Sequence, residues 1–407
     1  MLRHRLGSPT SGLSAVSRLA RTPGRWLALG LTLALTLAGC AGTRWQASPS
    51  APGEAQALAG GYGPAERVAV LLPSSGGFAT GAFGKAVGAI RDGILAAQGA
   101  DDPARRPQID FVDASQVGRT RTLIDAAANG GAKYVIGPLQ KPAVDLLAAG
   151  KALPVPVLAL NRAAQDGGRS ANLFQYALAP EDEGLSAAQA AWAAGHRSAL
   201  LLYPKTPWAE RLVQSFRGQW LSLGGQIAGQ KAYGGAGMAP DVAVQALLGG
   251  RAADPSAGGS CVFLVATRES ARAIWPRIQA AGGLPTYATS LVYPGDFDPG
   301  LDAVLAGLYF VDIPWMLAKD DGPLSRQAVR RTLPGIGASD QRLYAMGIDA
   351  YRLAPRAVDL AKHPGSFYAG QTGTLRVDAK GQVQRQLVVG RYTPTGVVLA
   401  SAGGSAR

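Results

Sequence analysis

The sequence contains few of the residues that build most catalytic and metal sites. Among 407 residues there are two cysteines and three histidines, and aromatic residues make up 7% of the chain. No H-E-x-x-H motif or Cys/His cluster is present, so nothing supports a zinc site. The G-x-S-x-G motif of serine hydrolases is also absent. We therefore expect neither catalysis, nor a metal, nor a cofactor.

The first 39 residues have the order of a bacterial export signal. They carry five arginines and no lysine or acidic residue, and residues 27–38 form an apolar run of twelve. A run of this length suits the core of a signal peptide better than a membrane span. It ends at L-A-G-C (37–40), which resembles the lipobox of bacterial lipoproteins. The resemblance implies cleavage before Cys40 and acylation of its thiol. The alternative is an ordinary signal peptide with an incidental cysteine.

The residue after Cys40 bears on the destination of the lipoprotein. It is Ala41 rather than aspartate, and the rule for such lipoproteins then favours the outer membrane, facing the periplasm. Several acyl chains form a stable anchor, because each buried methylene contributes about 0.8 kcal/mol. Residues 40–65 are rich in Ala, Gly, Pro and Ser and show no helical or strand period. This composition predicts a flexible, lipid-anchored tether.

Charge gives little evidence for a polymeric ligand. Removing the leader with its five arginines lowers the net charge from +13 to about +8. The basic residues form no dense block with interleaved aromatic residues, so we expect scattered surface arginines and no nucleic-acid binding. With Cys40 acylated, Cys261 has no disulfide partner, and its sequence CVFLVAT predicts a buried strand in which the thiol is a small hydrophobe.

The stretch Arg67–Ala97 predicts the architecture. Val68–Leu72 is an apolar run of strand length, which suits a strand buried on both faces. A glycine-rich loop follows from residue 74 to 84, and apolar residues then recur at helical spacing through residue 95. A strand, a tight turn and an amphipathic helix form the first half of a βαβ unit.

The same loop fails the test for a phosphate site. A P-loop needs G-x-x-x-x-G-K-[ST], but Ala79 stands where its first glycine is required, and Ala86 follows Lys85. We therefore interpret the glycines as serving a tight connection between strand and helix.

Strands and helices alternate along the rest of the chain. Such alternation with short connections predicts parallel sheets covered by helices on both faces. A hairpin is expected near the end, from residues 373–378 and 383–392 around the turn Lys380-Gly381. Further strands are expected at 108–113, 134–136, 155–160, 174–178, 199–203, 261–266, 285–290 and 307–312, with helices at 119–129, 142–149, 180–195, 206–220, 267–281 and 342–353.

The order of these elements is similar to the type I periplasmic binding protein fold, with two α/β lobes. We predict lobe 1 from residues 66–175 plus 307–365 and lobe 2 from 176–306 plus 366–395, with 396–407 as a C-terminal tail. In this arrangement the strand at 307–312 returns the chain to lobe 1.

Several segments resemble the LpoA/LppC-type family of penicillin-binding protein activator lipoproteins, over about residues 66–395. The segment A-L-A-P-E-D-E (177–183) is the most specific of them. The other matching segments are LLPSSG (71–76), Gly84, IRDG (90–93), VIGPL (135–139), LALN (158–161), GIDAYRL (347–353) and GTL (373–375).

The resemblance implies no reaction. It implies an outer-membrane lipoprotein that binds a class A penicillin-binding protein and activates its peptidoglycan synthesis. The long N-terminal helical-repeat region of the family has no counterpart in this sequence, and we expect the tether in its place.

The fold also implies an alternative, a periplasmic receptor for an amino acid or other small polar ligand. Amino-acid receptors of this fold place hydroxyl groups and backbone N–H groups against the ligand's carboxylate. The residues expected at the cleft are Ser74, Ser75, Gln140 and Asn161 from lobe 1 and Tyr203, Thr206 and Thr267 from lobe 2. Capping of the following helices explains Thr206 and Thr267 equally well.

Overall fold

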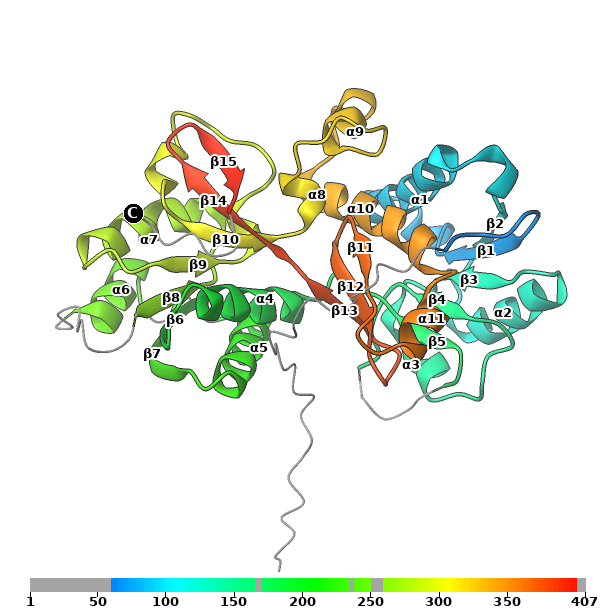
Figure 1. Cartoon of the computed structure of the whole chain (residues 1–407), viewed down its shortest axis with the longest axis horizontal. Helices are drawn as coiled ribbons and strands as arrows, with labels where there is room; N and C mark the ends of the chain where they lie inside the picture. The colour runs from blue at the N-terminus through cyan, green and yellow to red at the C-terminus, as the bar shows by residue number, and fades with distance from the viewer. Residues whose placement is uncertain (1–59, 165–169, 235–237, 250–258, 401–407) are drawn as a thin grey trace, which may run out of the picture. The chain divides into compact units, whose positions relative to one another are not determined.

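The computed structural model describes residues 60–164, 170–234, 238–249 and 259–400 (Figure 1). Cys40, the signal segment, most of the tether and the end of the tail lie outside these residues.

The first sheet is parallel throughout, as predicted. The strand order is β2-β1-β3-β4-β5. Its strands are β1 (Arg67–Leu72), β2 (Gln108–Asp113), β3 (Tyr134–Ile136), β4 (Val157–Ala159) and β5 (Leu173–Gln175). The helices between these strands are α1 (Gly81–Ala100), α2 (Thr120–Asn129) and α3 (Lys141–Ala148), with short 3-10 turns η1 (Gly76–Phe78), η2 (Pro103–Arg105) and η3 (Val117–Arg119).

Strand β1 is buried on both faces, which confirms the interpretation of its apolar run. Alternate side chains enter different cores: Val68 and Val70 join the core beneath α1, whereas Ala69 and Leu71 join the core of α2 and α3. In the loop that follows, Gly76 and Gly81 have φ values of +62° and +67°. These left-handed conformations favour glycine, so the loop glycines serve geometry.

The second sheet is mixed, with the strand order β15-β14-β10-β9-β8-β6-β7. It is parallel from β7 to β10, and β14 and β15 add antiparallel. Its strands are β6 (Ser198–Pro204), β7 (Gln226–Tyr233), β8 (Ser260–Leu264), β9 (Thr286–Ala288), β10 (Tyr309–Asp312), β14 (Val388–Thr393) and β15 (Gly396–Leu399). The helices of this part are α4 (Pro180–Ala193), α5 (Pro207–Ser222), α6 (Pro240–Leu248) and α7 (Arg268–Ala280), with turns η4 (Ser290–Val292) and η5 (Ala303–Leu305).

Strand β10 corrects one expectation. The segment 307–312 was predicted to return the chain to lobe 1, but β10 pairs with β9 and β14 in the second sheet. An apolar run shows that a strand is buried without showing which sheet buries it. The return runs instead through the helices that follow, which are α8 (Pro314–Leu317), α9 (Arg326–Thr332), α10 (Ala338–Leu353) and α11 (Ala357–Lys362).

The expected hairpin is correct only in its first part. Strand β12 (Gly373–Val377) pairs antiparallel with β11 (Tyr368–Gly370) and β13 (Val383–Gln386) in a third, small sheet. Leu387 then separates β13 from β14, and β14 belongs to the second sheet. The run predicted as one strand at 383–392 is therefore two strands in different sheets (Figure 1).

Two glycines let α1 and α10 cross at close range. A Cβ atom added to Gly93 would lie 2.0 Å from the carbonyl oxygen of Tyr344, and one added to Gly347 would lie 2.1 Å from that of Ile90. Both distances are far inside van der Waals contact with backbone. The segments IRDG (90–93) and GIDAYRL (347–353) are thus explained as two halves of one helix crossing.

Candidate functional site

In the loop after β1, the backbone N–H groups of Ser74 and Ser75 already have hydrogen-bond acceptors within the chain. The backbone N–H of Ser74 donates to Asp113 Oδ1 over 2.9 Å and to Ser115 Oγ over 3.2 Å. The N–H of Ser75 donates to Ser115 Oγ over 3.0 Å. Hydrogen bonds from Ser115, Ser75 and Ser74 hold the pKa of Asp113 well below its usual range. Asp113 and Ser115 of the chain itself therefore occupy the backbone donors of Ser74 and Ser75, which we expected to be open to a ligand.

The two amide side chains predicted for this edge also have internal partners. Gln140 Nε2 donates to the Ser115 carbonyl over 3.3 Å, while its buried Oε1 accepts no hydrogen bond from any described residue. Asn161 donates to the Leu139 carbonyl over 3.0 Å and accepts from the Arg162 N–H over 2.9 Å. The structure thus joins Ser74, Ser75 and Gln140 through Ser115, and it uses Asn161 to shape its own loop.

Two of the three second-lobe candidates, Thr206 and Thr267, perform the capping duties that we kept as alternatives. Thr206 caps α5 and accepts from the Ala209 N–H over 3.3 Å. Thr267 caps α7 and accepts from the Ser270 N–H over 3.3 Å. Tyr203 lies half-buried near the end of β6. In the described part of the chain, no hydrogen bond joins these residues to the first-lobe candidates. A role in ligand binding remains a prediction for all seven.

The motif A-L-A-P-E-D-E supplies three acidic residues, and each has a defined partner. Half-buried Glu181 pairs with Arg211 over 2.7 Å. Glu183 accepts from the Ser290 N–H over 2.8 Å and from its hydroxyl over 2.9 Å, and burial raises the pKa of this carboxyl. Asp182, between them, is 1% exposed.

Asp182 is the centre of a buried ionic cluster. It pairs with Arg385 of β13 over 2.8 Å and with Arg162, in the loop after β4, over 3.2 Å. Arg385 also donates to the carbonyls of Thr372 and Ala179, both over 3.3 Å. The cluster ties the start of α4 to two segments remote in sequence. Asp182 lies in the matching segment A-L-A-P-E-D-E, but nothing in the sequence indicates that it pairs with Arg385.

Two further buried carboxylates fix α10. Arg342 holds Asp312, at the end of β10, through contacts of 2.9 Å and 2.5 Å. Asp349 accepts from the N–H groups of Gln371 and Thr372 over 2.8 Å and 2.7 Å and from the Thr372 hydroxyl over 2.7 Å. Burial raises the pKa of Asp349 to about 6, against the lowering effect of these hydrogen bonds. Asp182, Glu183 and Asp349 of the matching segments therefore have structural partners in this fold.

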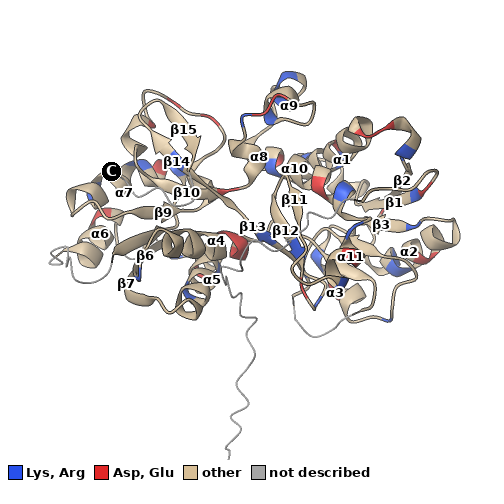
Figure 2. Cartoon of the chain, in the orientation of Figure 1, with Lys and Arg blue, Asp and Glu red and all other residues tan. Residues whose placement is uncertain are grey.

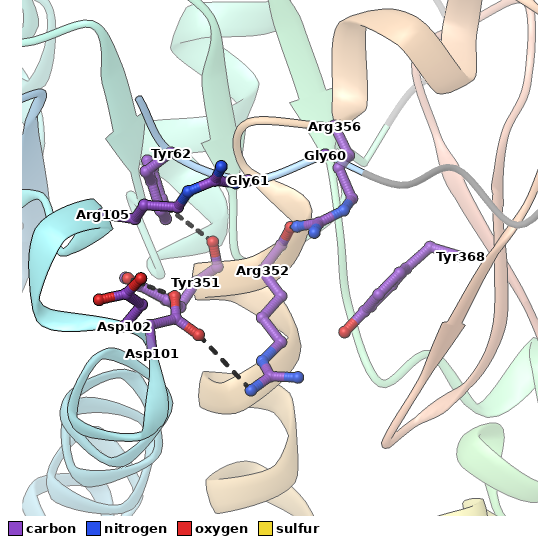
Figure 3. A pocket seen from close by; sticks show the side chains of 10 residues that line it. All are labelled: Gly60, Gly61, Tyr62, Asp101, Asp102, Arg105, Tyr351, Arg352, Arg356 and Tyr368. Atoms are coloured by element: carbon purple, nitrogen blue, oxygen red, sulfur yellow. Dashed lines mark hydrogen bonds and ion pairs between the residues drawn. The ribbon is translucent and has the colours of Figure 1, made fainter. Parts of the chain in front are cut away.

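One pocket contains cationic groups that the chain does not fully use. It has a volume of about 210 Å³. In Figure 3, the side chains of Arg352 and Arg356 extend from the end of α10 and the residues after it, and Tyr368 of β11 faces them across the opening. The remaining lining residues are Gly60, Gly61, Tyr62, Asp101, Asp102, Arg105 and Tyr351.

The described residues offer no other obvious chemistry. Within the ranges that the structure describes, no group of three or more His, Cys, Asp or Glu residues could hold a metal ion. Cys261 is fully buried in β8, and burial raises the pKa of its thiol to about 12. Lysine and arginine are distributed over many elements (Figure 2). No helix in the described ranges has the length and apolarity needed to cross a membrane.

The chain is similar to one family over most of its length. A model of the family described as "LppC putative lipoprotein" matches residues 58–394. The penicillin-binding protein activator LpoA of Edwardsiella piscicida is 32% identical over 311 residues, which cover 68% of this chain and 44% of that protein. The chain thus spans less than half the length of this curated relative.

Solved structures show the same fold. The C-domain of LpoA from Haemophilus influenzae, described as a regulator of PBP1A, is 26% identical with a TM-score of 0.69, and the match covers 83% of this chain and 100% of that domain. A Chromobacterium violaceum protein, described as a "putative branched-chain amino acid ABC transporter", is 28% identical with a TM-score of 0.62, covering 80% of this chain and all of that one. These likenesses confirm the predicted two-lobed binding-protein fold.

Proposed function

The chain belongs to the LppC lipoprotein family, and we propose that it is a non-catalytic lipoprotein that binds and activates a class A penicillin-binding protein in peptidoglycan synthesis. The observation that carries this proposal is the match to the complete Haemophilus influenzae C-domain, a regulator of PBP1A. A domain with a regulatory role in a relative is present here from end to end. The curated relatives are named as activators rather than as catalysts.

The proposal includes the location of the protein. L-A-G-C (37–40) with Ala41 supports acylation of Cys40 and attachment to the outer membrane on its periplasmic side. The family description as a lipoprotein is consistent with this attachment. Because a class A penicillin-binding protein acts on peptidoglycan precursors outside the inner membrane, the two proteins would meet in the periplasm.

The alternative function is a receptor for a small polar ligand. The similarity to the Chromobacterium violaceum protein is the observation that favours it. The loop after β1 argues against an amino acid in the expected place. Asp113 and Ser115 already accept from the N–H groups of Ser74 and Ser75, and displacing them would sacrifice charge-assisted hydrogen bonds.

The test uses the mature chain with Cys40→Ser, which lacks the acylated thiol. We expect it to bind a purified class A penicillin-binding protein and to increase its rate of glycan polymerisation on a lipid-linked precursor. The Chromobacterium violaceum protein, which has the same fold, is the control and should leave the rate unchanged. Absence of both binding and stimulation would refute the activator role.

A further inference from the structure

We propose that the pocket between Tyr62, Tyr368 and the arginines Arg105, Arg352 and Arg356 binds a single carboxylate group. None of the residues predicted for the cleft lines this pocket, and the activator role does not require it. Its floor and walls come from three separate parts of the chain, namely the start of the described region, the turn after α1, and the stretch from α10 to β11 (Figure 3).

The size of the pocket limits its ligand. A volume of about 210 Å³ equals that of about seven water molecules, each taking about 30 Å³. Sites for drug-sized molecules and cofactors have about 300–1,000 Å³. The pocket therefore suits an acidic group on a short stem, which a small organic acid or an acidic side chain of a peptide can supply.

The two aspartates of the pocket compensate its arginines only in part. Asp101 accepts from the Tyr351 hydroxyl over 2.9 Å, but its oxygen lies 3.7 Å from Arg352 Nη2. That separation is too long for a hydrogen bond. Asp102 accepts from the Ala104 N–H over 3.0 Å. Arg352 can therefore bind a closer carboxylate without breaking a hydrogen bond to Asp101.

Of the two half-buried arginines of the pocket, Arg352 and Arg356, the second has fewer partners for its charge. It donates to the Arg352 carbonyl and lies over the Tyr368 ring, 5.3 Å from its centroid, but it forms no ion pair with any described residue. Its buried Nε, like that of Arg352, has no hydrogen-bond partner among those residues. Burial lowers the pKa of Arg356, and the charge of Asp101 only partly offsets this effect.

The surroundings favour one carboxylate over phosphate. Asp101 and Asp102 share the pocket, so a dianion would meet more repulsion than a monoanion. The Tyr368 hydroxyl adds a donor, because burial raises the pKa of this phenol to about 12 and keeps it protonated. The aromatic walls of Tyr62 and Tyr368 suit a carbon stem next to the acidic group. Arginine then binds the carboxylate through paired N–H groups.

The experiment is a calorimetric titration of the mature Cys40→Ser chain at constant ionic strength. The probes are butyrate, which carries one carboxylate on a short carbon stem, inorganic phosphate, and a tripeptide with blocked, uncharged ends and glutamate at its centre. We expect saturable binding of butyrate, of the peptide, or of both, and much weaker binding of phosphate. Binding of butyrate alone would identify a free acid as the source, and binding of the peptide would identify an acidic side chain.

Three variants locate the binding. Arg356→Lys keeps the positive charge but loses the paired N–H donors of the guanidinium group, and we expect about a tenfold weaker affinity for the carboxylate probe. Arg105→Gln, at the exposed rim of the pocket, should weaken it about threefold, and it keeps the test valid if the first variant does not fold. Arg330→Gln, an exposed arginine of α9 away from the pocket, should change nothing. No saturable binding by either carboxylate probe, phosphate binding as tight as carboxylate, or an equal loss with Arg330→Gln would overturn the proposal.

Discussion

The loop after β1 and the pocket beside α10 differ in how far the chain satisfies its own polar groups. In the loop, Asp113 and Ser115 accept from the backbone donors of Ser74 and Ser75. In the pocket, Arg356 has no carboxylate partner among the described residues. Similarity to a fold thus indicates the edge of the sheet at which a ligand is expected. Only the hydrogen-bond partners show whether the polar groups at that edge are free to bind one.

The buried ionic cluster around Asp182 extends the comparison, because its carboxylate is buried and paired with two arginines. Removing one partner of a buried ion pair is costly, since the other charge is left without compensation. Removing a partner of an exposed pair costs little. The predictions below follow this order, from the largest expected effect to the smallest.

Asp182→Ala should have the largest effect. Arg385, whose side chain is 3% exposed, would lose its carboxylate, and so would Arg162. We expect the free energy of unfolding to fall by about 3–5 kcal/mol, measured by denaturant titration. The matched control is Asp110→Ala, which breaks the pair with Arg67, whose side chains are 38% and 44% exposed. It should cost less than about 1 kcal/mol. Equal losses in the two variants would show that the cluster is not structural.

Asp349 should produce a pH dependence that Asp349→Asn lacks. Burial raises its pKa from an ordinary 3.8 to about 6 in the folded state, so the folded protein binds this proton more tightly than the unfolded chain. Stability from this group is full below about pH 4 and is lost as the pH rises through about 6. The wild type should therefore lose up to about 3 kcal/mol relative to the variant between pH 4 and 7. Parallel pH profiles of the free energy of unfolding would contradict this account.

Asp113→Ala should have a small effect, because the hydrogen bonds that it removes are exposed. We expect a loss of about 1 kcal/mol at neutral pH. Since the folded-state pKa of Asp113 is depressed, its contribution is present above the ordinary value and is lost as the pH falls. The difference between wild type and variant should thus narrow in acid. A variant as stable as the wild type at neutral pH would mean that Asp113 does not hold the Ser74–Ser75 backbone.

Much of the fold follows from local patterns. The run Val68–Leu72 predicts a strand buried on both faces, and its side chains do enter two cores. The strands that pair with β10 could not be predicted from its apolar run, because such a run does not indicate which strands lie beside it. The change of sheet at Leu387 was also missed, since no proline or glycine interrupts the run from 383 to 389.

The candidate site was less predictable than the fold. Ser74 and Ser75 do lie at the carboxyl end of β1, where ligand-binding loops gather. Their occupation by Asp113 depends on the pairing of β1 with β2, a tertiary contact. The sequence D-A-S (113–115) directly after the strand at 108–113 was a usable signal, because neighbouring parallel strands end at the same edge. The pocket at Arg356 gave no such signal, since its lining combines residues from 60 to 368.

The most direct test of the central claim titrates the mature Cys40→Ser chain in two parallel experiments. One titrant is a class A penicillin-binding protein, and the other is each of the twenty amino acids in turn. The account predicts saturable binding of the penicillin-binding protein and no amino acid bound at the loop of Ser74 and Ser75. Tight binding of an amino acid that a Ser75 variant abolishes, with no binding of the penicillin-binding protein, would contradict it.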